Sequence, residues 1–285
     1  MKLHKIMLVC AAMAMLVTGC KEDKNMPGDN DNNQAEKYVV PAKADPAGVP
    51  EDVMEDAITV TEALDICRQL ASGAESEESY KVKGWVCNYD PSSNKTAILE
   101  YGNANFYLAV NPESRVKDAL YCYQSMGLDG KSIFNVNGIQ KGDYVVVQCY
   151  LTNYNGTLET TGKGQTMMLY SSNEKVAAMP ENLIEVSCAE ARLILDNLAA
   201  NKSASDFYSV TGYVTTKPSS YSFWIGDAVD DGEVVQAYSY EQPDGLAKGM
   251  KVRVWGALKH YVNKSGDYTP EITHGGMEIL EEAEE

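Results

Sequence analysis

An internal repeat constrains the fold of this chain most. The pattern of residues 58–154 returns in residues 184–261. The matching positions in the two copies are Ala63 and Ala191, Ile66 and Ile194, Leu70 and Leu198, Tyr80 and Tyr208, Val82 and Val210, Gly84 and Gly212, and Val86 and Val214. Each copy is long enough to bury a core of its own. The sequence therefore predicts two domains of one fold, residues 58–179 and residues 180–280.

Each copy is expected to begin with a short amphipathic helix. In the second copy, Ser187 and Glu190 form the Ser-x-x-Glu capping box that marks a helix start. Ala191, Leu195 and Leu198 then recur at spacings of three and four, which places them on one helical face. The first copy shows the same stripe less regularly.

Strands are expected after each helix, because apolar or small residues alternate at Val82, Gly84 and Val86. Further strands are predicted at 96–101, 104–110, 143–152 and 157–169 in the first copy, and at 221–226, 233–240, 249–261 and 268–280 in the second. A helix followed by five strands is typical of a five-stranded Greek-key barrel, the OB fold. An immunoglobulin-like sandwich is the alternative, but it needs about seven strands per domain. The predicted class is all-β with short helices, in two tandem OB-fold-like barrels.

The second copy also carries a family resemblance. Its segments 208–214, 222–227, 248–258 and 269–272 resemble the OB-fold repeats of Bacteroidetes surface lipoproteins, which largely lack an assigned function. The resemblance implies an OB fold and an envelope location. It also implies a helix before the fourth strand, for which residues 116–123 fit in the first copy.

Residues 1–19 predict a secretory signal. Lys2 and Lys5 precede an apolar run, residues 6–17, that is shorter than the roughly 18 residues needed to cross a bilayer. The ending Leu-Val-Thr-Gly-Cys resembles a lipobox, which implies cleavage before Cys20 and attachment of a lipid to its sulfur. The signal thus predicts a membrane-anchored chain.

The segment after Cys20 is expected to be a disordered tether, residues 20–57, since it has no apolar period. Lys21-Glu22-Asp23-Lys24 resembles the export tag of lipoproteins displayed on the outer leaflet. The resemblance implies a place on the bacterial outer membrane at the cell surface, with periplasmic retention as the alternative. Residues 281–285 are expected to be an acidic tail.

The net charge weakens the case for one class of partner. The chain has 24 basic and 41 acidic side chains, a formal net charge of −17. Nucleic-acid binding depends on neutralising phosphates with Lys and Arg, so the overall composition does not favour it.

The chain lacks sequence motifs of catalysis. Beyond the predicted signal it has only His260 and His274, with no His-Glu-x-x-His or Gly-x-Ser-x-Gly pattern. Both histidines are expected to face solvent, and no enzyme activity or cofactor is predicted. The acidic cluster around Gly232 favours a hairpin turn over a cation site. Five cysteines lack the Cys-x-x-Cys spacing of zinc sites and are expected to be buried thiols, with one disulfide as the alternative: Cys67, Cys87, Cys122, Cys149 and Cys188.

Binding surfaces are the better candidates for function. OB barrels bind ligands across their second and third strands and adjoining loops. The candidate binding residues there, and on the fourth strand beside them, are Tyr221, Trp224, Tyr238, Lys251, Arg253, Trp255 and Lys259. The first domain offers the aromatic residues Trp85, Tyr89, Tyr101, Phe106 and Tyr107. The alternative is a solvated strand face balanced by acids on its neighbour.

Three functional hypotheses follow from these patterns. The first is a non-enzymatic surface lipoprotein that binds an extended ligand, a glycan or a protein partner. The second is single-stranded nucleic-acid binding through the basic residues of the second domain. The third is a structural part of an envelope assembly.

Overall fold

The computed structural model describes residues 40–161 and 166–283, which belong to one compact unit, Val40–Glu285. The predicted signal, the lipidated Cys20 and the first part of the tether lie outside the described residues. Within them, no helix has the length and apolar character needed to cross a membrane.

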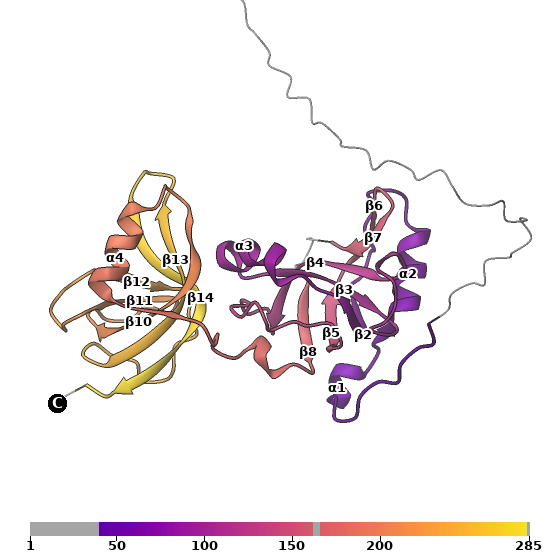
Figure 1. Cartoon of the computed structure of the whole chain (residues 1–285), viewed down its shortest axis with the longest axis horizontal. Coiled ribbons are helices and arrows are strands. Elements are labelled where there is room, and N and C mark those ends of the chain that lie inside the picture. The colour runs from indigo at the N-terminus through magenta and orange to yellow at the C-terminus, as the bar shows by residue number, and fades with distance from the viewer. Residues whose placement is uncertain (1–39, 162–165, 284–285) are drawn as a thin grey trace, which may run out of the picture. The chain divides into compact units, whose positions relative to one another are not determined.

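The N-terminal part of this unit is a sheet with short helices and helical turns around it (Figure 1). Its elements are α1 (Glu51–Met54), β1 (Ile58–Thr59), α2 (Val60–Gln69), β2 (Tyr80–Asn88), α3 (Pro91–Tyr101), β3 (Ala104–Ala109), η1 (Val116–Asp118), β4 (Leu120–Leu128), β5 (Tyr144–Cys149), β6 (Leu151–Tyr154), β7 (Thr157–Thr160), β8 (Met167–Ser171) and η2 (Glu174–Val176).

The C-terminal part is a second sheet with one helix among its described residues. Its elements are β9 (Ile184–Ser187), α4 (Cys188–Asn197), β10 (Ser203–Val214), β11 (Ser222–Gly226), β12 (Val235–Tyr238), β13 (Lys251–Val262) and β14 (Tyr268–Glu281). Strands dominate both parts, which confirms the prediction of a mostly β chain with short helices.

The C-terminal sheet closes on itself as a five-stranded barrel. Its strands pair in the order β10-β11-β12-β14-β13 and then back to β10, with β12 and β14 parallel and the other pairs antiparallel. Val210, Phe223 and Val254 point into the barrel and are fully or nearly fully buried. This is the closed OB-like barrel that the alternation of apolar residues predicts.

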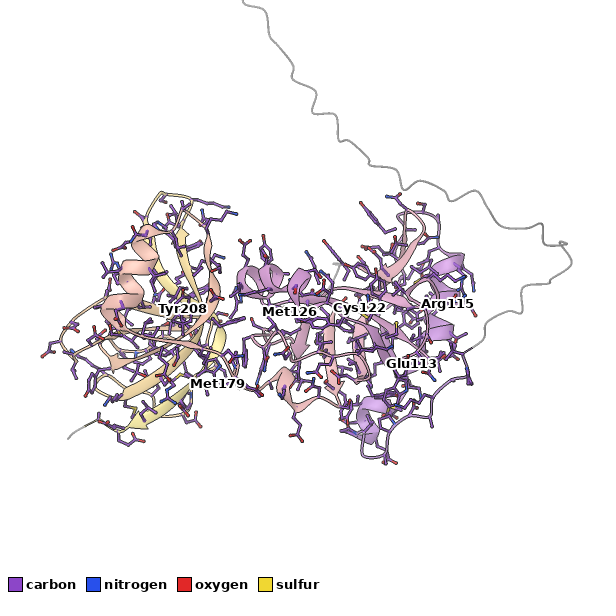
Figure 2. The ribbon with its side chains drawn as sticks, in the orientation of Figure 1. Glu113, Arg115, Cys122, Met126, Met179 and Tyr208 are labelled. Carbon is purple, nitrogen blue, oxygen red and sulfur yellow. The ribbon has the colours of Figure 1, made fainter. Side chains whose placement is uncertain are left out.

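The N-terminal sheet pairs its strands in the same order. β2 pairs with β3, β3 with β4, β4 with β8 in parallel, β8 with β5, and β5 with β2. The β6–β7 hairpin lies beside it, and β7 pairs with β4. Cys122 on β4 is buried in the core that this sheet encloses, whereas Arg115 lies on the loop between β3 and η1 (Figure 2).

The two predicted helices, α2 and α4, each begin directly after a capping residue. Ser187 accepts a hydrogen bond from the backbone N–H of Glu190, and the Glu190 carboxylate accepts one from the backbone N–H of Ser187. Thr59 and Glu62 make the same pair of bonds at the start of α2. Each box satisfies N–H groups that a helix start leaves without partners.

The predicted strand at residues 96–101 is wrong, because α3 occupies this segment. The Asp90 side chain accepts a hydrogen bond from the Ser92 N–H at the helix start, and Pro91 sits at the first helical position. Gly102 ends the helix in the left-handed conformation, φ 69°.

The predicted helix at residues 116–123 is also wrong. Only the turn η1 forms there, and β4 begins at Leu120. Leu120 and Cys122 are fully buried in the core while Tyr121 and Tyr123 point the other way, which is the period of a strand. The predicted strand 157–169 is divided into β7 and β8.

The packed part of the chain begins before residue 58, inside the segment that the sequence assigns to the tether. Val49, Val53 and Met54 pack against Trp85 and Tyr144 on the outer side of β2 and β5. The Lys81 ammonium donates hydrogen bonds to the carbonyls of Asp52 and Glu55, and the Lys43 ammonium lies 3.6 Å from the centre of the Trp85 ring. Residues 40–57 therefore cover one face of the N-terminal sheet.

Candidate functional site

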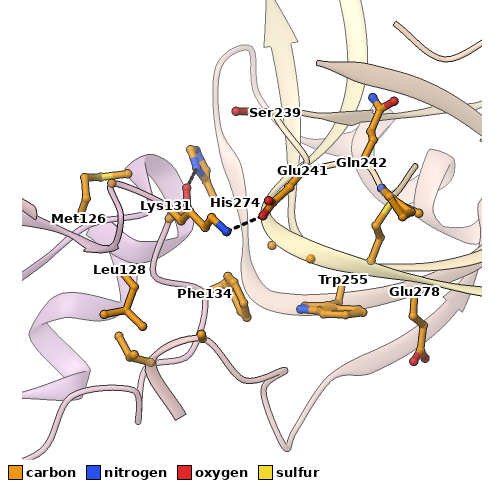
Figure 3. Close-up of a pocket in the computed structure, with 18 of the residues that line it drawn as sticks. Met126, Leu128, Lys131, Phe134, Ser239, Glu241, Gln242, Trp255, His274 and Glu278 are labelled. Carbon is orange, nitrogen blue, oxygen red and sulfur yellow. Dashed lines mark hydrogen bonds and ion pairs between the residues drawn. The ribbon is translucent and has the colours of Figure 1, made fainter. Parts of the chain in front are cut away.

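A pocket of about 960 Å³ lies between the N-terminal and C-terminal sheets (Figure 3). The N-terminal side of its lining comes from the end of α3, from β4, from the loop after β4 and from the segment around η2. The C-terminal side comes from the loop after β12 and from β13 and β14. The lining residues are Tyr101, Met126, Leu128, Gly130, Lys131, Ser132, Phe134, Val176, Ala177, Ser239, Glu241, Gln242, Pro243, Trp255, His274, Gly275, Gly276, Met277, Glu278 and Ile279.

The two sheets also contact each other through residues outside this lining. The Lys95 ammonium on α3 lies 2.6 Å from the Asp206 carboxylate on β10. Phe207 and Ala257 of the C-terminal barrel belong to the core of the N-terminal sheet. The two sheets are therefore joined by an ion pair and by apolar packing as well as by the pocket walls.

A bulge in the β13–β14 pair shapes the C-terminal wall. Trp255 lies opposite Gly276, but Ala257 lies opposite Thr273, so β14 carries one extra residue between these pairs. His274 sits in the bulge with φ 55°, a conformation that side chains seldom adopt. The bulge brings both His274 and Trp255 into the pocket lining.

An aromatic pair forms the centre of the lining. The rings of Phe134 and Trp255 meet edge to face, with centroids 6.4 Å apart and an interplanar angle of 69°. The methionine and aliphatic side chains of Met126, Leu128 and Met277 lie in the same lining. Such a surface releases water favourably when a ligand's apolar group covers it.

Ion pairs stand at the polar rim of the pocket. The Lys131 ammonium lies 2.5 Å from the Glu241 carboxylate (Figure 3), and the hydrogen bond to that carboxylate raises the pKa of Lys131. The Arg253 guanidinium lies 2.7 Å from the Glu278 carboxylate.

The imidazole of His274 is half-buried in the lining. Its Nδ1 lies 3.1 Å from the Ser132 Oγ, and burial, aided by the charge of Lys259, lowers its pKa to about 4. The imidazole is thus neutral at pH 7.

His260 is also half-buried, stacks on Tyr268 with centroids 3.9 Å apart, and lies with its Nδ1 2.9 Å from the Leu195 carbonyl. The prediction that both histidines face solvent is wrong, because contacts between distant segments enclose them.

Two donors in the lining lack hydrogen-bond partners. Among the described residues, the Nε1 of Trp255 and the Nε2 of Gln242 are buried and bond to no protein atom. A buried donor without a partner costs about 1–3 kcal/mol. Indole and amide N–H groups donate to acceptors such as carbonyl oxygens.

The predicted binding residues do not all meet at one site. Trp255 lines the pocket, whereas Tyr221, Trp224 and Tyr238 do not. Trp224 and Tyr238 lie on the outer face of the β11–β12 pair, whose alternate residues fill the barrel. Tyr221 is 71% exposed beside them.

The basic stripe on β13 is matched by acids on β14. Lys251 lies 2.8 Å from the Glu281 carboxylate, and Arg253 pairs with Glu278 as described above. Lys259 lies directly opposite Glu271. Burial raises the pKa of Glu271 to about 7, and the charge of Lys259 opposes that rise. This arrangement agrees with the alternative of a strand face balanced by its neighbour.

The aromatic residues of the first domain also separate. Phe106 is buried in the core, and Trp85 is covered by residues 40–57. Tyr89 donates a hydrogen bond to the Val136 carbonyl, while Tyr107 packs on Tyr121 with centroids 4.8 Å apart. Tyr101 alone of this set lines the pocket.

The cysteines are buried thiols, and an acidic residue near the Gly232 turn bonds to the start of a helix. The five described cysteines are free and buried, and burial raises the pKa of Cys67 and Cys87 to about 11. Asp227 accepts hydrogen bonds from the backbone N–H groups of Cys188 and Ala189 at the start of α4. Within the described ranges, no group of three His, Cys, Asp or Glu side chains is placed to hold a metal ion.

Sequence reasoning missed most of the pocket. Lys131, Ser132 and Phe134 lie in the loop between β4 and β5, and Gln242 lies in the loop after β12. Neither loop has a repeated pattern or motif that marks it. The one available signal was Phe134, since the chain has only four phenylalanines and a loop is an uncommon place for one.

No family model matches the sequence, and no match was found among curated proteins. Among solved structures, the HINa domain of Ifi202 in complex with 20 bp dsDNA is similar at 11% identity and a TM-score of 0.23, over 73% of this chain and 98% of that one. The HINb domain of p204 is similar at 13% identity and a TM-score of 0.21, over 73% of this chain and 93% of that one. At these TM-scores neither likeness informs the fold or the ligand.

Proposed function

We propose that this chain is a non-enzymatic binding protein, anchored to the bacterial outer membrane by a lipid on Cys20 and displayed at the cell surface. Its domains, residues 58–179 and 180–280, are two tandem OB-fold barrels, each preceded by a short helix. The pocket between them holds part of an extended ligand. The lipobox-like ending at Cys20 supports the anchor, and the shared pairing order of the two sheets supports the tandem barrels.

The observation that carries the binding role is the pocket with Trp255 in its wall. Its volume of about 960 Å³ lies at the upper end of the range typical of ligand sites, roughly 300–1,000 Å³. It combines an aromatic and aliphatic lining with a few polar groups, as ligand sites do. Both sheets contribute to it, so an occupant would contact both domains.

The environment of the lining side chains favours binding over catalysis. The carboxylates of Glu241 and Glu278 are each paired with a cation, and His274 contacts the Ser132 hydroxyl. General acid–base or nucleophilic catalysis needs a group poised to exchange a proton or attack a substrate. The two carboxylates are instead neutralised by their cations, and burial lowers the pKa of His274 to about 4, which makes its imidazole a weak general base.

The nucleic-acid alternative is less favoured by this geometry. Lys251 and Arg253 face carboxylates on β14, so a phosphate backbone would compete with existing ion pairs and approach nearby acids. Such a site gains little from phosphate neutralisation.

A lipid-labelling experiment tests the anchor. In cells given a labelled fatty acid, the wild-type chain is expected to carry the label and to remain in the outer-membrane fraction. The Cys20→Ala variant is expected to lose both properties, and external protease is expected to remove the wild-type domains from intact cells. An unlabelled wild-type chain would contradict the anchor, and full protection from protease would contradict surface display.

A binding screen tests the pocket. The lipid-free chain from Lys21 onward, which contains the compact unit Val40–Glu285, is applied to arrays of glycans and peptides. Ligands of the wild-type protein are expected to be lost by Trp255→Ala and retained by Trp224→Ala, which removes an indole outside the pocket. Equal binding by both variants would place the ligand elsewhere.

A further inference from the structure

We infer that the pocket binds a segment of a protein partner, in which an apolar side chain is flanked by Lys or Arg. This inference rests on the proposed binding function and names the ligand class of the same site. It follows from the apolar lining, the net negative charge of the chain and the two unpartnered donors.

The lining suits an apolar side chain better than a sugar. Met126, Leu128, Val176, Met277 and Ile279 present only hydrocarbon or thioether groups. A sugar carries hydroxyls around its ring, and hydroxyls buried against such groups would lose bonds to water without replacement. A Leu, Ile, Met or Phe side chain gains free energy from the same contact.

The aromatic pair and the methionines give the pocket the character of a protein-binding site. Trp255 is a residue type that commonly dominates the energy of protein interfaces. Met126 and Met277 stand on opposite walls, since one comes from β4 and the other from β14. Flexible methionine side chains adapt to differently shaped apolar groups.

The net charge of the chain favours a basic flank. At the rim itself, the carboxylates of Glu241 and Glu278 are balanced by the cations of Lys131 and Arg253. The side chains of Glu241 and Glu278 are 76% and 46% exposed, so both can meet a ligand's cation. The net charge of the whole chain, −17, also attracts a basic segment from a distance.

The unpartnered donors match a peptide backbone. The N–H groups of Trp255 and Gln242 are buried in the lining without acceptors. A peptide brings a carbonyl acceptor at each residue. Both N–H groups are buried, so the inference requires each side chain to shift and present its N–H to the bound peptide.

A selection experiment tests the inference. A displayed library of random short peptides is selected on the lipid-free chain from Lys21 onward and, in parallel, on its Trp255→Ala variant. The expected enriched peptides carry an apolar residue between Lys or Arg residues. Their affinity is expected to fall by about tenfold or more in Trp255→Ala, to fall less in Trp255→Phe, and to be unchanged in Trp224→Ala. Circular dichroism melting of each variant establishes that it is folded.

The outcomes separate the inference from the proposed function. Enrichment of acidic or wholly polar peptides would overturn the inference, as would a peptide pool that binds Trp255→Ala equally well. If glycans bind in a manner that depends on Trp255 while peptides do not, the inference fails and the proposed function stands. If neither a glycan nor a peptide panel yields a ligand that depends on Trp255, both fail.

Discussion

The indole ring of Trp255 lies against the backbone of Gly276 across the β13–β14 pair. A β-carbon added at position 276 would lie 2.5 Å from Cζ2 of the indole and 2.8 Å from Cε2. No real β-carbon tolerates such contacts, so glycine at this position allows the ring to lie where it lines the pocket. The relationship links one backbone position on β14 to the shape of the proposed binding site.

The Gly276→Ala substitution is therefore expected to displace the indole of Trp255. The overpacked side chain should lower the free energy of unfolding by about 1–3 kcal/mol, shift the tryptophan emission spectrum and weaken ligand binding. Urea denaturation and fluorescence of the folded variant measure these effects. The control is Gly266→Ala, which strains a turn backbone at φ +90° and so also lowers stability, but whose added β-carbon meets open space away from Trp255. Loss of binding in both variants, or in neither, would contradict this role of Gly276.

The buried carboxyl of Glu271 is expected to make stability depend on pH. Glu271 is 5% exposed, and burial raises its pKa from 4.5 to about 7 in the folded chain. As pH rises from about 4.5 to about 7, the unfolded chain ionises this group first, so wild-type stability should fall relative to Glu271→Gln by up to about 3 kcal/mol. Urea midpoints across this range measure the difference.

His274 contributes a trend of opposite sign over nearly the same range. Its pKa is lowered from 6.5 to about 4, so its contribution to stability is present above pH 6.5 and is lost as pH falls toward 4. The comparison must therefore be made between Glu271→Gln and wild type rather than from the wild-type curve alone. Glu233→Gln, at an exposed turn residue, is the control. A gap between wild type and Glu271→Gln that does not change with pH would contradict the burial of the carboxyl.

The paired stripe on β13 predicts weak binding to nucleic acid. Labelled single-stranded DNA is expected to show no tight binding to the wild-type chain at physiological salt, as measured by fluorescence anisotropy. The Lys251→Gln and Arg253→Gln double variant should lose little stability, because exposed ion pairs contribute little. Tight binding that weakens steeply with salt and disappears in the double variant would favour the nucleic-acid alternative.

The sequence predicts the barrel well where local patterns decide structure. The capping box at Ser187 and Glu190 places α4, and the alternation at Val210 and Val254 places strands of the C-terminal barrel. The errors have physical causes of two kinds. For α3, the helix signals at Asp90, Pro91 and Gly102 are present in the sequence, but the prediction placed a strand over the segment between them. For β4, the helix that the family resemblance implies was preferred to the strand that the alternation of Leu120 and Cys122 indicates.

The candidate site was predictable only in part. The parity of β13 placed Trp255 on the outer face of the barrel, and the structure agrees. Its partner Phe134 comes from a loop more than a hundred residues earlier in the chain, and no local pattern encodes such a meeting. The same is true of the contact between Ser132 and His274. Sites assembled from loops of two domains depend on tertiary packing that local periodicity does not express.

Hydrogen–deuterium exchange most directly tests the claim that a ligand occupies the pocket between the two domains. The measurement compares the lipid-free chain alone and with the tightest-binding member of the glycan and peptide panels. The account predicts slower exchange on both walls, at residues 126–134 of the N-terminal sheet and residues 274–279 of β14. Protection confined to the β11–β12 face around Trp224 and Tyr238, with no change on either wall, would contradict it.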